Sequence, residues 1–395
     1  MKAPLPCAPG DAVALARDLV RIDSRNPSLV AGGPGEEGAA RLLRTVLDAW
    51  GFHTELMEVA PGRPNVIARI GQGIGPTIML NGHLDVVGTV GMTHAPFEAE
   101  VRDGRIYGRG ACDMKGGVAA MCAAAWRAHA AGTLRGQVVI AAVIDEEWES
   151  LGTRTLLERG VRADAAVVTE PTRLTVAPAH RGFAWLEVTV HGRAAHGSRY
   201  DEGVDAIILA AQLLTELDRF EREELTQRTH PLLGRASLHA STIAGGAGLS
   251  TYPERCTFTI ERRTLPGESA ELALREVREA CERVRARRPG FRADVVPLTA
   301  QAPSDVAVDA PLVRALAAAL AAEGEPARVE GLSCWTDAAL LNAAGIPAVC
   351  FGPGDIALAH ADEEWIAIDD IERATRVLTR LLATWTSGDA ATWRS

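Results

Sequence analysis

Two histidines and three carboxylates follow one another along the 395-residue chain: His83, Asp113, Glu147, Glu170 and His360. Imidazole nitrogens combined with carboxylate oxygens suit divalent ions of borderline softness, of which zinc is the most common example. A carboxylate can bridge two such ions that lie about 3.5–4 Å apart. The residue types therefore predict a site for a pair of metal ions, and the chemistry they favour is metal-assisted hydrolysis.

Two further carboxylates stand beside these candidate ligands. Glu146 precedes Glu147, and adjacent residues at the end of an extended strand point in opposite directions. We therefore expect Glu147 to bind metal and Glu146 to act on the attacking water as general base. Asp85 lies two residues after His83 and is expected to orient it, because a ligating imidazole usually donates its second N–H to a nearby partner.

Each candidate also has an ordinary structural interpretation. Asp113 lies among four glycines, which allow the close approach that a bridging carboxylate needs, but it could equally cap the helix that follows. His83 could be a loop histidine beside a solvated aspartate, His360 a surface or core histidine, and Glu170 a carboxylate at the rim of a sheet. The acidic run that begins at Asp145 could be a solvated turn. Five such signals in series favour the metal site.

The elements expected around these residues alternate between helix and strand. Continuous apolar runs predict buried strands of a mainly parallel sheet at residues 77–80, 138–144, 165–168 and 348–351. Apolar residues at helical spacing predict helices over residues 37–51, 117–131 and 370–386. Open α/β sheets place their sites beyond the carboxyl ends of the strands, which is where the candidate ligands occur.

The pattern changes near residue 180. Strands are expected at residues 183–190, 236–243, 255–260 and 291–296, with helices at 203–220 and 268–285. The order β-α-β-β-α-β is the ferredoxin-like arrangement. We therefore predict an α/β protein in which a catalytic domain, residues 1–178 and 299–395, is interrupted by an inserted ferredoxin-like domain at residues 179–298.

The composition narrows the class of protein. A hydrophobic content of 47% and a charged content of 23% are typical of a globular protein, and a net charge of −10 argues against nucleic acid as a partner. The first residues lack the apolar segment of a signal peptide, and no apolar run is long enough to cross a membrane. The seven cysteines form no Cys-x-x-Cys pair, which favours reduced thiols and a cytoplasmic location.

The candidate ligands and the general base lie in the following segments of the chain: Asn81-Gly82-His83-x-Asp85, Tyr107-Gly108-Arg109-Gly110-x-x-Asp113-Met114-Lys115-Gly116, Asp145-Glu146-Glu147, Glu170-Pro171-Thr172 and the late His360. This combination resembles the family of acetylornithine deacetylase, succinyl-diaminopimelate desuccinylase, aminoacylase and glutamate carboxypeptidase. The resemblance implies that His83 and Glu170 hold one zinc ion. Glu147 and His360 would hold the other, with Asp113 bridging the two. It also implies a cis peptide bond after Asp113.

Two segments of the inserted domain match the same family. The stretch 192–198 is similar to the segment whose histidine, here His196, reaches the active site of the partner subunit, where an imidazole could stabilise an oxyanion. The stretch 261–267 is similar to the segment whose arginine, here Arg263, grips the substrate carboxylate; a surface ion pair is the other interpretation. Many relatives have Asn where this chain has Ser250, so a polar contact to substrate would be weakened or replaced. The resemblance thus implies a homodimer joined through the inserted domain.

These features predict a cytoplasmic, homodimeric two-zinc amidohydrolase, with cobalt or manganese as alternative ions. A metal-bound water, deprotonated toward Glu146, would attack the amide carbonyl of an N-acyl amino acid, as in acetylornithine deacetylase or succinyl-diaminopimelate desuccinylase. A dipeptidase or carboxypeptidase with the same chemistry is the first alternative. A non-catalytic, metal-stabilised dimeric binding protein is the second, and the presence of Glu146 beside all five ligands disfavours it. We expect neither nucleic acid nor a membrane as a partner.

Overall fold

The computed structural model describes residues 7–73 and 75–387, so the outermost residues of the predicted catalytic domain lie outside the described part. The chain forms two compact units, each with its own core. The first unit consists of Met1–Pro178, Val306–Glu330 and Thr336–Ser395, and the second of Ala179–Asp305 and Gly331–Trp335. Among the described helices, none combines the length and the apolar character needed to cross a membrane.

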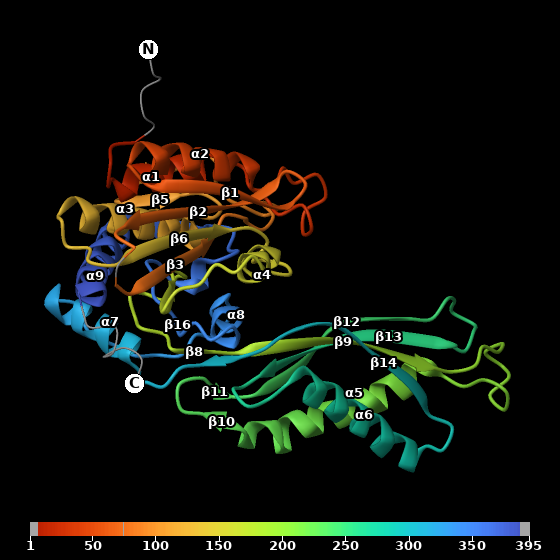
Figure 1. Ribbon diagram of the computed structural model, residues 1–395. Coiled ribbons are helices and arrows are strands. Elements are labelled where there is room, and N and C mark those ends of the chain that lie inside the picture. The colour runs from red at the N-terminus through yellow and green to blue at the C-terminus, as the bar shows by residue number, and fades with distance from the viewer. Residues whose placement is uncertain (1–6, 74, 388–395) are drawn as a thin grey trace. The chain divides into compact units, whose positions relative to one another are not determined.

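A six-stranded mixed sheet forms the centre of the first unit (Figure 1). In spatial order its strands are β1 (His53–Ala60), β2 (Arg63–Gly71), β6 (Gln137–Val143), β3 (Thr77–His83), β7 (Ala165–Val168) and β16 (Ala348–Cys350). The four strands from β6 to β16 run parallel, which confirms the mainly parallel sheet. The antiparallel pair β1 and β2 extends one edge and was not predicted. Most residues of β1 are at least partly exposed, so this strand lacks the continuous apolar run of the others.

Helices cover the sheet of the first unit. They are α1 (Ala12–Val20), α2 (Glu37–Ala49), α3 (Gly116–Ala130), α4 (Leu151–Glu158), α7 (Pro311–Ala322), α8 (Ala338–Ala343) and α9 (Ile368–Ser387). The predicted helices correspond to α2, α3 and α9. A separate three-stranded sheet contains β4 (Glu100–Arg102), β5 (Arg105–Tyr107) and β17 (Trp365–Ala367).

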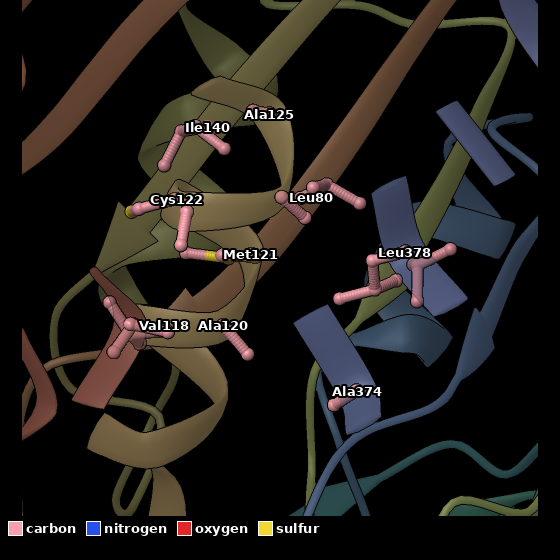
Figure 2. Close-up of a cluster of buried hydrophobic side chains, with 14 of the residues drawn as sticks. Leu80, Val118, Ala120, Met121, Cys122, Ala125, Ile140, Ala374 and Leu378 are labelled. Carbon is pink, nitrogen blue, oxygen red and sulfur yellow. The ribbon is translucent and has the colours of Figure 1, made fainter. Parts of the chain in front are cut away.

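Helix α3 is buried on every side along its first ten residues. It packs against α1 and α9 and also contacts β3 and β6. Figure 2 shows the resulting cluster, in which Met121 of α3 lies among Leu80 of β3, Ile140 of β6 and Leu378 of α9. A helix that is apolar all round must be buried, and its many alanines let neighbouring elements approach closely. This packing fixes the N-terminal end of α3, which begins three residues after Asp113.

Gly117 makes the closest approach between α3 and the sheet. A Cβ atom at this position would lie 2.1 Å from the carbonyl oxygen of Thr169, the residue before Glu170. Gly117→Ala should therefore destabilise the protein by roughly 1–3 kcal/mol or more, despite a gain of about 1 kcal/mol in helix propensity. Denaturant unfolding measures the change. Gly290→Ala is the control, because no atom lies within 4 Å of its added Cβ; equal stability of the two variants would contradict the prediction.

The second unit is a four-stranded antiparallel sheet that carries two helices (Figure 1). In chain order its main elements are β9 (Gly182–His191), α5 (Ala206–Glu223), β12 (Ser237–Gly245), β13 (Arg255–Thr264), α6 (Ala270–Arg287) and β14 (Arg292–Gln301). This order confirms the predicted β-α-β-β-α-β arrangement, and the strands lie in the order β12-β13-β9-β14. A short hairpin, β10 (Thr229–His230) with β11 (Gly234–Arg235), was not predicted. The pair β8 (Ala179–His180) and β15 (Ser304–Asp305) also belongs to this unit.

Candidate metal centre

The five predicted ligands converge within the first unit. His83 is the last residue of β3, and Asp113 lies in a π-helical turn, Ala111–Lys115, just before α3. Glu147 lies in the turn after β6, Glu170 follows β7, and His360 occupies a loop after the short helix Ile356–Leu358. Parallel strands present their carboxyl ends at one edge of the sheet, so residues far apart in sequence meet there.

Asp113 lies between the two imidazoles. Its Oδ1 is 3.0 Å from Nε2 of His83, and its Oδ2 is 3.5 Å from Nε2 of His360. Nε2 of His360 also lies 3.0 Å from Glu147, while Nε2 of His83 lies 4.0 Å from Glu170. Each oxygen of Asp113 therefore faces a different imidazole–carboxylate pair. This is the arrangement that a carboxylate bridging two cations requires.

The alternative role of Asp113 as a helix cap is wrong. Helix α3 begins after Lys115, and no side chain caps it. The side chain of Asp113 is instead engaged by the two imidazoles. The peptide bond between Asp113 and Met114 is cis, as the resemblance implied.

Glu146 belongs to the same cluster. Ligand atoms of His83, Glu146 and Glu170 lie within 4.8 Å of one another, as do those of His83, Asp113 and Glu147. Both glutamates thus come within reach of a cation near His83. The assignment of Glu147 as ligand and of Glu146 as base remains a prediction.

The expectation that Glu146 and Glu147 end an extended strand, and so point in opposite directions, was wrong. Strand β6 ends at Val143, and both glutamates lie in the turn that follows, where strand alternation does not apply. Asp145 begins this turn with a left-handed backbone, at a φ of 65°. Its side chain is fully buried, so the alternative of a solvated acidic turn is also wrong.

Asp85 acts differently from the prediction. Nδ1 of His83 donates to the backbone carbonyl of Asp85 at 2.9 Å, while the nearer Asp85 carboxylate oxygen is 3.6 Å away. The carbonyl fixes the tautomer and leaves Nε2 free as a ligand atom. The carboxylate of Asp85 instead accepts hydrogen bonds from the backbone N–H groups of Glu146 and Glu147, at 3.1 and 3.2 Å. Asp85 therefore holds the turn that carries both glutamates.

Burial and mutual repulsion govern the carboxylates. Burial, followed by the charge of Glu170, raises the pKa of Glu146 well above its ordinary value. Burial, followed by the charge of Asp113, raises the pKa of Glu147 and that of Glu170. Divalent cations would relieve this repulsion and favour the ionised carboxylates. The chemistry of the donor set therefore fits metal ions.

Asp113 contrasts with the glutamates because it lies between two imidazoles. Burial opposes its ionisation, but hydrogen bonds from His360 and His83 hold the pKa of Asp113 well below its usual range. Burial also opposes charge on both imidazoles, yet the hydrogen bond to Asp113 raises the pKa of His83. Hydrogen bonds to Asp113 and Glu147 raise the pKa of His360 to about 10. Metal binding at these Nε2 atoms must therefore displace protons.

Sequence reasoning missed the residues that support this cluster. Glu364 accepts the backbone N–H groups of Cys112 and Asp113, at 2.9 and 3.1 Å, and pairs with buried Arg109 at 2.6 Å. This contact fixes the turn that carries Asp113. The run of three acidic residues, Asp362 to Glu364, which begins two residues after His360, was the available signal. A second group, formed by Arg63, Glu36 and Asn26, supports the turn that carries Glu146. No sequence pattern marked these residues.

The second unit contains the remaining predicted residues. His196 is exposed, and its Nδ1 lies 2.8 Å from the hydroxyl of Ser198. Ser250 lies beside this loop, since its carbonyl accepts the N–H of Gly197 at 2.8 Å. Arg263 pairs with Glu261 at 2.9 Å and keeps 30% of its side chain exposed. In this conformation Arg263 makes the ion pair that was its alternative interpretation.

Together, the parallel sheet with carboxylates and imidazoles at its carboxyl edge defines a hydrolase of the metal-dependent α/β class. The chain belongs to peptidase family M20/M25/M40, whose model matches residues 79–384. The chain is 31% identical over 353 residues to an acetylornithine deacetylase from Myxococcus xanthus, covering 87% of this chain and 90% of that protein.

Two further similarities show how varied the relatives are. The chain is 26% identical over 413 residues to N-formyl-4-amino-5-aminomethyl-2-methylpyrimidine deformylase from Bacillus subtilis, covering 95% of this chain and 94% of that protein. The structure superimposes on a tripeptidase from Staphylococcus aureus with a TM-score of 0.81 at 20% identity, covering 97% of this chain and 100% of that one. All three relatives are named for cleaving an acyl–nitrogen bond.

Proposed function

We propose that this protein removes the acyl group from an N-acyl amino acid, with N-acetylornithine as first choice, using two divalent ions held by the first unit. The observation that carries the proposal is Asp113, whose two oxygens face two different imidazoles. His83 and Glu170 are assigned to one ion, and Glu147 and His360 to the other. The N/O donor set suits zinc, and it also accepts cobalt or manganese.

Glu146 is assigned as the proton carrier. When bound, the ions would polarise the amide carbonyl and acidify the attacking water. The carboxylate of Glu146 accepts a proton from that water and delivers it to the departing nitrogen, so that an amine and a carboxylate leave. Its burial and its closeness to Glu170 raise its pKa, which suits a group that must hold a proton between the two steps.

Arg263 is assigned to the α-carboxylate of the substrate. A guanidinium has five N–H donors, and its pairing with Glu261 leaves several of them available for a bidentate contact. Ser250, beside the loop of His196, is assigned a weaker polar contact. Both assignments rest on the family resemblance together with the partial exposure of Arg263.

We also propose that two copies pair through the second unit. Strand β12 is an edge strand and is exposed along most of its length. Ile207, Ile208 and Ile243 are 40%, 53% and 57% exposed, and Ile207 lies close to Gly246, the residue that follows β12. An open edge beside exposed apolar residues suits pairing with a second copy. His196 would then reach the site of the partner. In the described part of the chain, no disulfide joins any of the seven cysteines, which supports a cytoplasmic location.

A substrate panel with metal removal tests the deacylase proposal. Chelator treatment should abolish activity, and added zinc or cobalt should restore it, because the water and carbonyl are activated only when ions are bound. N-acetyl, N-succinyl and N-formyl amino acids are compared with dipeptides and tripeptides. If the site recognises the α-carboxylate of the substrate, an α-carboxamide analogue of the best substrate should have a higher KM. Preference for peptides would favour the peptidase alternative, which the tripeptidase-like fold motivates. Metal binding without hydrolysis of any amide would favour the binding protein.

A further inference from the structure

We propose that the buried ion pair of Arg63 and Glu36 is a positioning device for the metal site. Its task is to fix the turn that carries Glu146 and Glu147. The inference rests on the proposed function and adds residues that no sequence motif singled out. It concerns the first unit alone.

Two carboxylates hold the turn directly. Asp85 accepts the N–H groups of Glu146 and Glu147, as described above. Asp145 accepts the N–H of Glu149 through its side chain at 3.3 Å, and its carbonyl accepts the N–H of Ser150 at 2.6 Å. These hydrogen bonds tie the turn to the two aspartates. The orientation of Glu146 therefore depends on where these two carboxylates lie.

Asn26 and Arg63 join the two carboxylates to each other. The amide nitrogen of Asn26 donates to Asp85 at 2.8 Å and to Asp145 at 3.1 Å. Arg63 donates to the side-chain amide oxygen Oδ1 of Asn26 at 3.2 Å and to the carboxylate of Asp145 at 3.0 Å. Asn26 is thus held at both ends, and both Asp85 and Asp145 are fixed through it.

Glu36 anchors the guanidinium from the other side. It accepts from Nε of Arg63 at 2.8 Å and from Nη2 at 2.6 Å, a bidentate contact. The Glu36 side chain is fully buried, and that of Arg63 is 11% exposed. The chain of contacts runs from Glu36 through Arg63 and Asn26 to the backbone of the turn.

A stabilising role alone is a poor explanation for this pair. Desolvation of buried charges largely cancels their attraction, so a buried ion pair is weak evidence for stability. A planar guanidinium can contact Glu36, Asn26 and Asp145 at fixed angles, which a lysine ammonium cannot do. Fixed geometry is what a ligand and a base on one short turn require, and supporting contacts of this kind typically set metal affinity or activity by about 10–100-fold.

The test compares Arg63→Gln, Arg63→Lys and Asn26→Ala with the control Arg373→Gln. Arg373 forms a similar bidentate pair with Glu325 in the same unit, at 2.8 and 2.5 Å. We expect each network variant to lower zinc affinity, measured by chelator competition, and kcat by about 10–100-fold, with little change in KM. Arg63→Lys keeps the charge but loses the planar contacts, so it should rescue only in part. The control should match wild type in both readouts.

Two results would overturn the inference. One is a folded Arg63→Gln protein with wild-type zinc affinity and kcat. The other is an equal loss in the control, which would show a general stability effect. If Arg63→Gln does not fold, Asn26→Ala answers the same question, because it breaks the link without leaving a buried charge unpaired. If wild type binds zinc but hydrolyses no amide, the proposed function fails, and zinc affinity alone decides the positioning role.

Discussion

Replacing Glu146 by glutamine should abolish most turnover while both metal ions stay bound. The amide keeps the size of the side chain but cannot accept a proton from the attacking water. Loss of a general base usually lowers kcat by about 10²–10⁴-fold. The expected result is a folded protein with a wild-type metal content by elemental analysis and a KM near that of wild type.

Two variants on the same turn make this result specific. Glu149→Gln changes an exposed glutamate three residues further on and should leave kcat unchanged. Glu147→Gln should lose metal affinity, because its side chain lies beside His360. If Glu146→Gln loses an ion while Glu147→Gln keeps both, the roles of the two glutamates are exchanged. The comparison of the two variants is needed because a ligand atom of each glutamate lies within 4.8 Å of one of His83.

The sequence predicted the helices and strands whose apolar residues follow a regular pattern. Buried parallel strands such as Ala165–Val168 are continuous apolar runs, and the helix Gly116–Ala130 is equally recognisable from its apolar content. The alternation in Gly182–His191 marked a strand with one buried face. Strand β1 gave no comparable signal, because only one of its residues is buried.

The candidate ligands could be found from sequence because each lies in a short segment with a distinctive composition. Their supports could not. Asn26 contacts Asp145 across 119 positions, and Arg63 contacts Glu36 across 27. Such contacts depend on how β2 and the N-terminal segment pack against the turn, and no spacing rule encodes that. The role of Asp85 was misassigned for the same reason: its partner is the backbone of a turn that was expected to be a strand.

Mixing two inactive proteins should restore activity if His196 completes the site of the partner subunit. His196→Ala and Glu146→Gln should each be nearly inactive alone. After subunit exchange, a heterodimer would hold one site with both residues intact and one site with neither. If about half of the dimers are mixed, activity should approach about a quarter of wild type. Co-purification of differently tagged subunits after mixing establishes that exchange takes place.

The local environment of His196 supports the partner role over a structural one. In the described part of the chain, the His196 ring has hydrogen bonds only with the hydroxyl and the backbone N–H of Ser198. The residue is exposed, and its backbone forms an isolated β-bridge with Thr251. A histidine held in this way contributes little to its own unit, so its removal should leave folding intact. Ser198→Ala is the control for the local contact and should keep most activity. If His196→Ala is active alone, or the mixture stays inactive after proven exchange, the imidazole does not act across the dimer.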